Sequence, residues 1–150
     1  MANGKTHLTA GIASGLAAAA YAARDQTGVG FVAELLGGAL GGAAGGQLPD
    51  VFEPAIHSWH RSTAHSFTTA TAIGVTAVRS LSSWQNRCRA NAIHHDALSK
   101  CAADGLARAW HAFVAFVWRL LSGVAAGLPA GYLSHLTLDA CTPRCIPLLA

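Results

Sequence analysis

Histidine and acidic side chains gather in three separate stretches of this sequence: near the start, around residues 50–65, and near the end. They are His7, Asp50, Glu53, His57, His60, His65, His135 and Asp139. A set of imidazoles and carboxylates suits Zn²⁺, or Mn²⁺ and related ions, better than Ca²⁺. These residue types predict a divalent metal site, with zinc favoured, if the fold brings the three stretches together.

The local spacing of these residues favours shared ligation. His135 and Asp139 are four residues apart, so on a helix they project from one face and can share a cation. His60 and His65 are five apart, which allows convergence without requiring it. Asp50 follows Pro49 just past a glycine-rich segment, where the chain is expected to reverse. In the alternative interpretation, the two aspartates cap helices and the histidines lie at an interface.

Other histidines and the cysteines carry weaker signals. His57, His94, His95 and His111 are expected to be ordinary polar residues, although the sequence HHD at 94–96 resembles the doublet of metal phosphohydrolases. The four cysteines form no CxxC pair, which argues against a zinc ribbon and favours free thiols. A contact between Cys141 and Cys145 stays open.

The composition indicates that lipid or a partner covers part of the surface. Apolar residues make up 52% of the 150 residues and charged residues 11%, against about 25% charged residues in ordinary soluble proteins. A small protein has a large surface to cover with polar groups, and here they are too few. The basic residues show no aromatic interleaving, so no nucleic-acid partner is expected.

Four apolar segments are candidates for helices, at residues 8–23, 28–46, 66–78 and 110–133. A bilayer span needs about 20 apolar residues, so the second and fourth qualify and the other two are marginal. No cleavage-site pattern follows a long apolar run, so a cleaved signal peptide is not predicted. Glycines four residues apart recur in the two long segments and predict close helix packing; they are Gly37, Gly41 and Gly45, Gly38, Gly42 and Gly46, and Gly123, Gly127 and Gly131.

Antiparallel threading of these segments predicts a single all-α domain, residues 1–150. It is a membrane-associated bundle of about four apolar helices, with the metal site at one end and a polar connecting segment, residues 79–108, at the other. Glu34 and Arg119 lie inside apolar segments, so either they pair or each extends to an interface. The connecting segment is rich in basic residues, which predicts a cytoplasmic connection and a site facing the periplasm.

Four motifs resemble those of one family when taken in order. They are THLTAG, LPDVFEPA, HRSTAHS and GYLSHLTLDACTPRCIPLL. The chain is similar here to the YdjM-like, inner-membrane-associated metal-dependent hydrolases. The resemblance implies a multi-pass protein of the bacterial inner membrane, distantly related to zinc-dependent phospholipase C and P1-type nucleases. The metal ligands that it implies are His7, Asp50, His60, His65, His135 and Asp139, with Arg61 beside them.

One position departs from the family pattern. Many members carry a second acidic residue two positions after the Asp of the PD motif, where this chain has Phe52, followed by Glu53. Either Glu53 substitutes for that acid or one ligand is missing.

Two functional hypotheses follow. In the first, the chain is an enzyme: Glu53 or Asp50 orients the attacking water as a base, Arg61 binds an anionic substrate oxygen, and the substrate is a phospholipid or a phosphate ester. In the second, the chain is a non-catalytic membrane protein. It then has a structural metal site, or its connecting segment docks a cytoplasmic partner.

Overall fold

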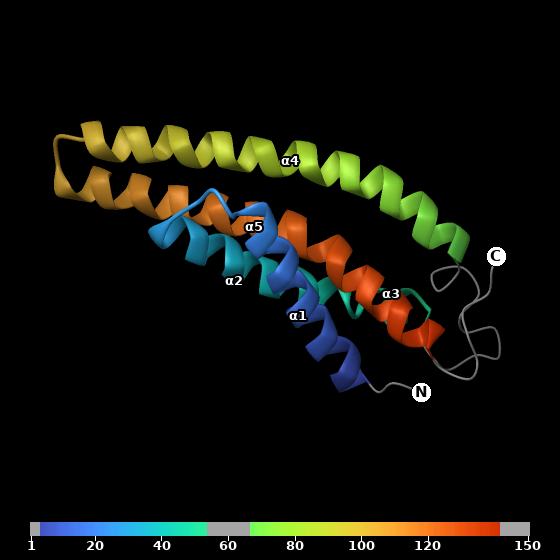
Figure 1. Cartoon of the computed structure of the whole chain (residues 1–150). Helices are drawn as coiled ribbons and strands as arrows, with labels where there is room; N and C mark the ends of the chain where they lie inside the picture. The colour runs from blue at the N-terminus through green and yellow to red at the C-terminus, as the bar shows by residue number, and fades with distance from the viewer. Residues whose placement is uncertain (1–3, 54–66, 142–150) are drawn as a thin grey trace.

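The computed structural model describes residues 4–53 and 67–141, and within these ranges the chain is a bundle of α-helices without a strand (Figure 1). The helices are α1 (Gly4–Ala22), α2 (Gly28–Gly45), α3 (Leu48–Phe52), α4 (Phe67–Cys101) and α5 (Gly105–Ala140). The predicted all-α class is therefore confirmed.

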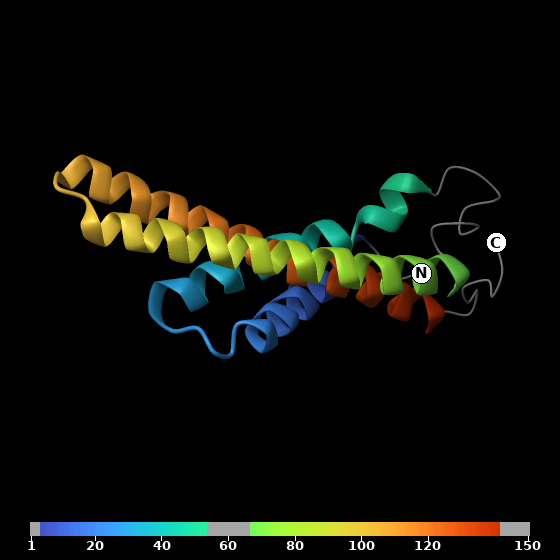
Figure 2. The same ribbon diagram turned by 90° about the horizontal axis from the view of Figure 1, so that it is seen from above.

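The helices form two layers that share α5. The α1–α2 hairpin packs against α5 on one side, and α4 runs antiparallel along α5 on another (Figures 1 and 2). The start of α1, the end of α2, α3 and the end of α5 lie at the same end of the bundle. At the opposite end, the α4–α5 hairpin extends beyond the turn between α1 and α2. The predicted antiparallel threading thus brings His7, Asp50, His135 and Asp139 to one end, whereas residues 54–66 lie outside the described ranges.

The prediction that residues 79–108 form an exposed connection between helices is wrong. The third apolar segment and most of this connection are one continuous helix, α4, and only residues 102–104 turn the chain into α5. Asp104 caps α5, because its side chain accepts a hydrogen bond of 2.7 Å from the Ala107 amide. Cys88 and Ala92 are fully buried on the inner face of α4. Residues 79–101 therefore pack along α5 instead of forming a loop at the far end.

Backbone-to-backbone packing at glycines joins α1, α2 and α5. A Cβ atom at Gly127 of α5 would overlap the carbonyl of Gly38 of α2, and one at Gly15 of α1 would overlap the same carbonyl. Gly131 of α5 stands in the same relation to the carbonyl of Gly42. No larger residue fits at these positions without moving a helix. The glycine spacing therefore indicated the helix interfaces correctly.

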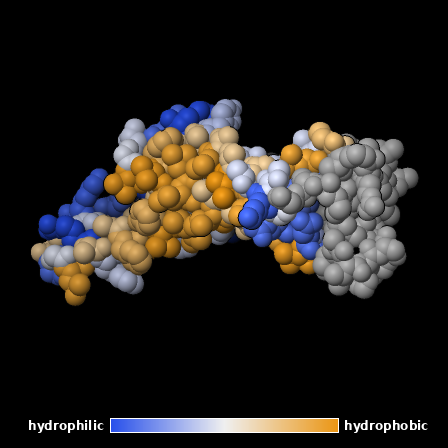
Figure 3. All heavy atoms as spheres, turned by 90° about the horizontal axis from the view of Figure 1, so that it is seen from below, coloured by the Kyte–Doolittle hydropathy of each residue, from blue (hydrophilic) through white to orange (hydrophobic). Residues whose placement is uncertain are grey.

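Helix α2 is apolar on its outer side as well as on its glycine-lined inner side. Val29, Val32, Leu36 and Leu40 are each about half or more exposed, and Figure 3 shows a broad hydrophobic face across the middle of the molecule. A helix that is apolar all round belongs in a protein core or in a membrane. Two segments, Gly28–Phe52 and Gly105–Ala140, are long and apolar enough to cross a membrane.

The predicted pairing of Glu34 with Arg119 is wrong. Glu34 is fully buried and receives two hydrogen bonds from Arg89 of α4, at 3.0 Å from Nε and 2.5 Å from Nη2. Arg119 instead donates to Asp96 at 2.6 Å and to Gln26 at 2.8 Å. Because Arg89 lies on helix α4, which packs along α5, its guanidinium reaches the buried Glu34 carboxylate. Sequence analysis had not identified Arg89 as a partner of Glu34.

Replacing Gly127 with alanine tests the glycine packing. We expect Gly127→Ala to destabilise the bundle by about 1–3 kcal/mol, since its methyl group must displace the Gly38 carbonyl. The matched control is Gly74→Ala in α4, where an added Cβ has nothing within 4 Å, so helix propensity should leave stability equal or higher. Unfolding of the detergent-solubilised protein, followed by circular dichroism, measures both. Equal stability of the two variants would contradict the packing.

Candidate metal centre

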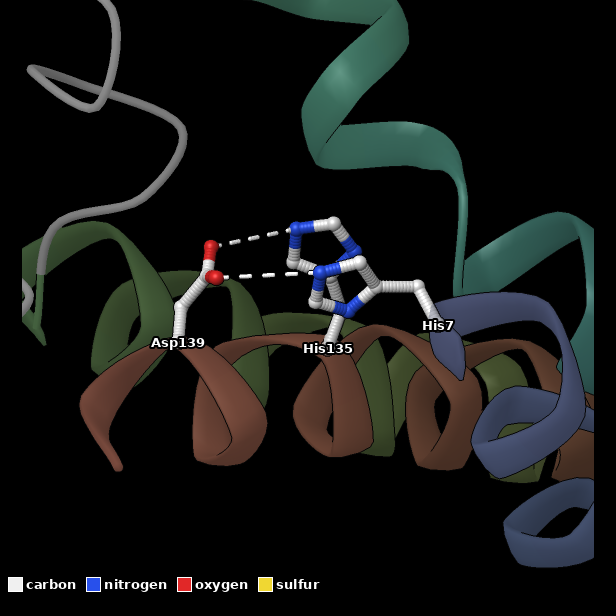
Figure 4. A group of neighbouring side chains, drawn as sticks. All are labelled: His7, His135 and Asp139. Carbon is white, nitrogen blue, oxygen red and sulfur yellow. Dashed lines mark ion pairs between the residues drawn. The ribbon is translucent and has the colours of Figure 1, made fainter. Parts of the chain in front are cut away.

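His7, His135 and Asp139 form a buried group at the end of the bundle where α1 begins and α5 ends. Their exposed fractions are 3%, 0% and 1%, and one ligand atom from each lies within 4.8 Å of the other two. Asp139 contacts both histidines: its Oδ1 is 3.7 Å from His7 Nε2 and its Oδ2 is 3.4 Å from His135 Nε2 (Figure 4). Three side chains that sequence analysis selected therefore converge.

The helices place these side chains by simple periodicity and close packing. His135 and Asp139 project from one face of α5, one turn apart, as their spacing predicted. His7 comes from the beginning of α1, and its ring stacks on that of His135 with centroids 3.8 Å apart and planes 19° apart. Both imidazoles thus face the same carboxylate.

A backbone carbonyl orients His135. Its Nδ1 lies 2.7 Å from the oxygen of Gly46, and because a carbonyl oxygen only accepts, Nδ1 carries the hydrogen. Nε2 then faces Asp139 at 3.4 Å and Asp50 at 3.6 Å. A histidine held in this way, with its other nitrogen bonded to a backbone carbonyl, is the usual arrangement around protein-bound metals.

The distances between these atoms are close to those between the ligands of one shared cation. Ligand atoms about 2.0–2.1 Å from a tetrahedral zinc ion are about 3.3–3.4 Å apart. The distances are 3.7 Å for His7–Asp139, 3.4 Å for His135–Asp139 and 3.6 Å for His135–Asp50. Nε2 of His135 faces two carboxylates, and their negative charge can be offset by a proton on Nε2 or by a metal ion between the groups. The residues present therefore fit a divalent metal.

Asp50 and Glu53 lie on the short helix α3 and at its end. The side chain of Asp50 is 43% exposed, so it lies at the solvent-facing edge of the group. Glu53 is buried close to Tyr132, whereas Phe52 is 70% exposed. Of the two residues that follow Val51, the acidic one therefore points into the protein, as it must if Glu53 substitutes for the acid missing at position 52.

The alternative interpretation of Asp139 as a helix cap is not what the structure shows. Asp139 lies within α5, and the cap is Cys141. Of the other predicted residues, His57, His60, Arg61 and His65 lie outside the described residues. Cys88, Cys101 and Cys141 are free thiols, as predicted. The Gly46 carbonyl was missed, since backbone atoms leave no side-chain signature; the glycine-rich end of α2 was its only signal.

Comparison of the chain with protein-family models, with curated proteins and with solved structures found no match. The resemblance to the YdjM-like hydrolases stays a prediction. The candidate metal centre is thus argued from its own geometry.

Removing the shared carboxylate tests the centre. We expect protein carrying Asp139→Ala to retain no divalent metal after purification in detergent, because both imidazoles lose their common partner, and His135→Ala to behave in the same way. The control is Thr137→Ala, an exposed position on the same turn of α5, which should keep the wild-type metal content. Elemental analysis by mass spectrometry gives the content of each. Wild-type metal levels in both site variants would contradict the assignment.

Proposed function

We propose that this protein is a membrane-bound, metal-dependent hydrolase of the YdjM-like family that acts on a phosphate-ester or lipid-like substrate. The observation that carries the proposal is the orientation of His135. Its Nδ1 is held by the Gly46 carbonyl while its Nε2 faces two carboxylates, beside a stacked His7. His7, His135, Asp139 and Asp50 are the proposed ligands among the described residues.

A divalent ion held by these residues would activate water and polarise a phosphoryl or acyl oxygen. Zinc is the favoured ion because two imidazoles and carboxylates suit it, and manganese or a similar ion is the alternative. The difference in burial between the two aspartates supports a catalytic rather than a closed site. Asp139 is 2% exposed and Asp50 is 43% exposed, so one side of the group is open to a substrate.

Two further side chains are assigned roles in this proposal. Glu53 is buried near Tyr132, one turn after Asp50, and serves as the base that receives a proton from the attacking water. Arg61, outside the described residues, is the proposed partner of an anionic substrate oxygen. His60 and His65, in the same stretch, complete the proposed set of ligands.

An apolar groove beside the site supports a lipid-like substrate. It has a volume of about 110 Å³ between α3, α4 and α5. Its lining residues are Leu48, Phe52, Gly74, Leu128, Pro129, Tyr132 and Leu133. Tyr132 is one turn before His135 on α5, so an acyl chain in this groove would place its polar end near the ligands.

The proposed location is the bacterial inner membrane, crossed several times. Helix α2, with 18 residues, is about 27 Å long, close to the thickness of about 30 Å of a bilayer core. At its two ends lie polar groups: the Arg119–Asp96 pair near the α1–α2 turn and the metal ligands beyond Gly45. The exposed face of α4 carries Asn86, Arg87 and Asn91, so protein or water must shield it from lipid.

The rival function is a structural metal site in a non-catalytic membrane protein. The three fully buried members of the group favour it, since structural sites are closed. Only turnover separates the two functions.

We expect metal-loaded protein in detergent to hydrolyse a phosphodiester, a phosphomonoester or a phospholipid, and a chelator to abolish the reaction until metal is restored. Asp139→Ala should be inactive at every metal concentration. Glu53→Gln should retain its metal and lose turnover, because it removes the base but none of the ligands in the buried group. Protein that binds metal and cleaves none of the three substrate classes would favour the structural role.

Membrane orientation is tested separately with reporters. We expect alkaline phosphatase fused at the C-terminus to be active in the periplasm, and a fusion in the turn at residues 102–104 to be inactive, because Lys100 and Arg108 keep the hairpin in the cytoplasm. The reverse pattern would place the metal centre in the cytoplasm, against the proposed orientation.

A further inference from the structure

A second pair of imidazoles lies near the other end of the molecule. His95 of α4 and His111 of α5 face each other with their Nδ1 atoms 3.0 Å apart, and both side chains are partly buried. We propose that these two histidines form a second metal site, independent of the first, which binds one transition-metal ion such as Cu²⁺ or Ni²⁺ through the two Nδ1 atoms.

The separation of the nitrogens fits two adjacent ligands on one ion. Two nitrogen atoms each about 2.1 Å from a metal, at a right angle, are about 3.0 Å apart, which is the observed distance. Imidazole is a ligand of intermediate softness, and the affinity of such sites rises toward Ni²⁺ and Cu²⁺. In the metal-free pair, one Nδ1 donates a hydrogen to the other, and an ion bound by both nitrogens would displace that hydrogen and lie beside the line that joins them.

The hairpin holds the two rings in position before any ion binds. The turn at residues 102–104 joins the helices directly, the hydroxyl of Ser99 donates to the Arg108 carbonyl at 3.0 Å, and Asp104 caps α5. Two ligands that are already placed lose little conformational freedom on binding. This rigidity distinguishes the pair from two mobile surface histidines.

The neighbouring charged side chains Asp96, Arg119 and Arg108 make hydrogen bonds with groups other than the two imidazoles. Asp96 and Gln26 accept hydrogen bonds from Arg119, the cation that lies two turns from His111 on α5, and the Ala102 carbonyl accepts one from Arg108. The described residues add no third protein ligand to the pair. Water must therefore complete the coordination, and the site should bind more weakly than the group of His7, His135 and Asp139.

This arrangement changes the interpretation of the HHD sequence at residues 94–96. Asp96 is directed to Arg119, and His94 is exposed and meets His95 only edge-on, with centroids 5.5 Å apart. The proposed ligands are therefore not His95 and Asp96, the doublet within HHD. They are His95 of α4 and His111 of α5.

Metal stoichiometry tests the proposal. The full-length chain in detergent, stripped of metal, is dialysed against Ni²⁺, and bound metal is measured for the wild type and for His95→Gln, His111→Gln and His94→Gln. We expect each of the first two variants to bind one ion fewer per chain than the wild type. His94→Gln, the neighbouring control, should bind as many as the wild type. Circular dichroism confirms that each variant is folded.

Spectroscopy identifies the ligands. With Cu²⁺ as the probe in the His135→Ala, Asp139→Ala background, we expect an electron paramagnetic resonance signal with coupling to two nitrogens, lost in His111→Gln. Unchanged Ni²⁺ stoichiometry in both His95→Gln and His111→Gln would overturn the proposal, whether or not the first centre binds metal. So would an equal loss in His94→Gln.

Discussion

The metal centre depends on how closely the backbone of α2 approaches its two neighbours. Gly42 lies against the Gly11 carbonyl of α1, and Gly131 of α5 lies against the Gly42 carbonyl. Because the helices pack this closely, the end of α2 lies beside α5, and the Gly46 oxygen is 2.7 Å from His135 Nδ1. Because α1 is held equally close, the His7 ring stacks on His135. Any side chain larger than hydrogen along this line would separate the three backbones and the ligands with them.

The helices and the core of the site were predictable because both depend on periodicity. The spacing of four residues that joins His135 to Asp139 is a property of any helix, and antiparallel threading brings His7 to the same end. The path of α4 was not predicted, because a polar composition was interpreted as a connection. The sequence did contain a signal for a long helix, because residues 75–104 include neither glycine nor proline. Asp104, before Gly105, is a residue type that commonly begins the next helix. The partner of Glu34 could not be found without this helix.

The two faces of α4 impose a further constraint. On its inner face, Arg89 satisfies the buried Glu34 and also donates to the Ala22 carbonyl at 2.7 Å. Removing the guanidinium would leave the fully buried Glu34 carboxylate without its cation, at a cost of about 3–5 kcal/mol. On its outer face, α4 carries exposed polar residues such as Asn86, Arg87 and Asn91 beside exposed Trp84 and Ile93. The exposed surface of α4 is therefore more polar than that of α2.

The same fold presents histidine pairs at both ends, and their surroundings predict different chemistry. At one end, two stacked imidazoles share a buried carboxylate, and a second carboxylate, Asp50, lies at the rim. Anionic ligands offset the charge of a divalent ion, so this site can hold it tightly while one side stays open. At the other end, His95 and His111 are neutral ligands without a carboxylate, because Arg119 engages Asp96. An ion there keeps its full charge and most of its water, which suits reversible binding that joins α4 to α5 rather than catalysis.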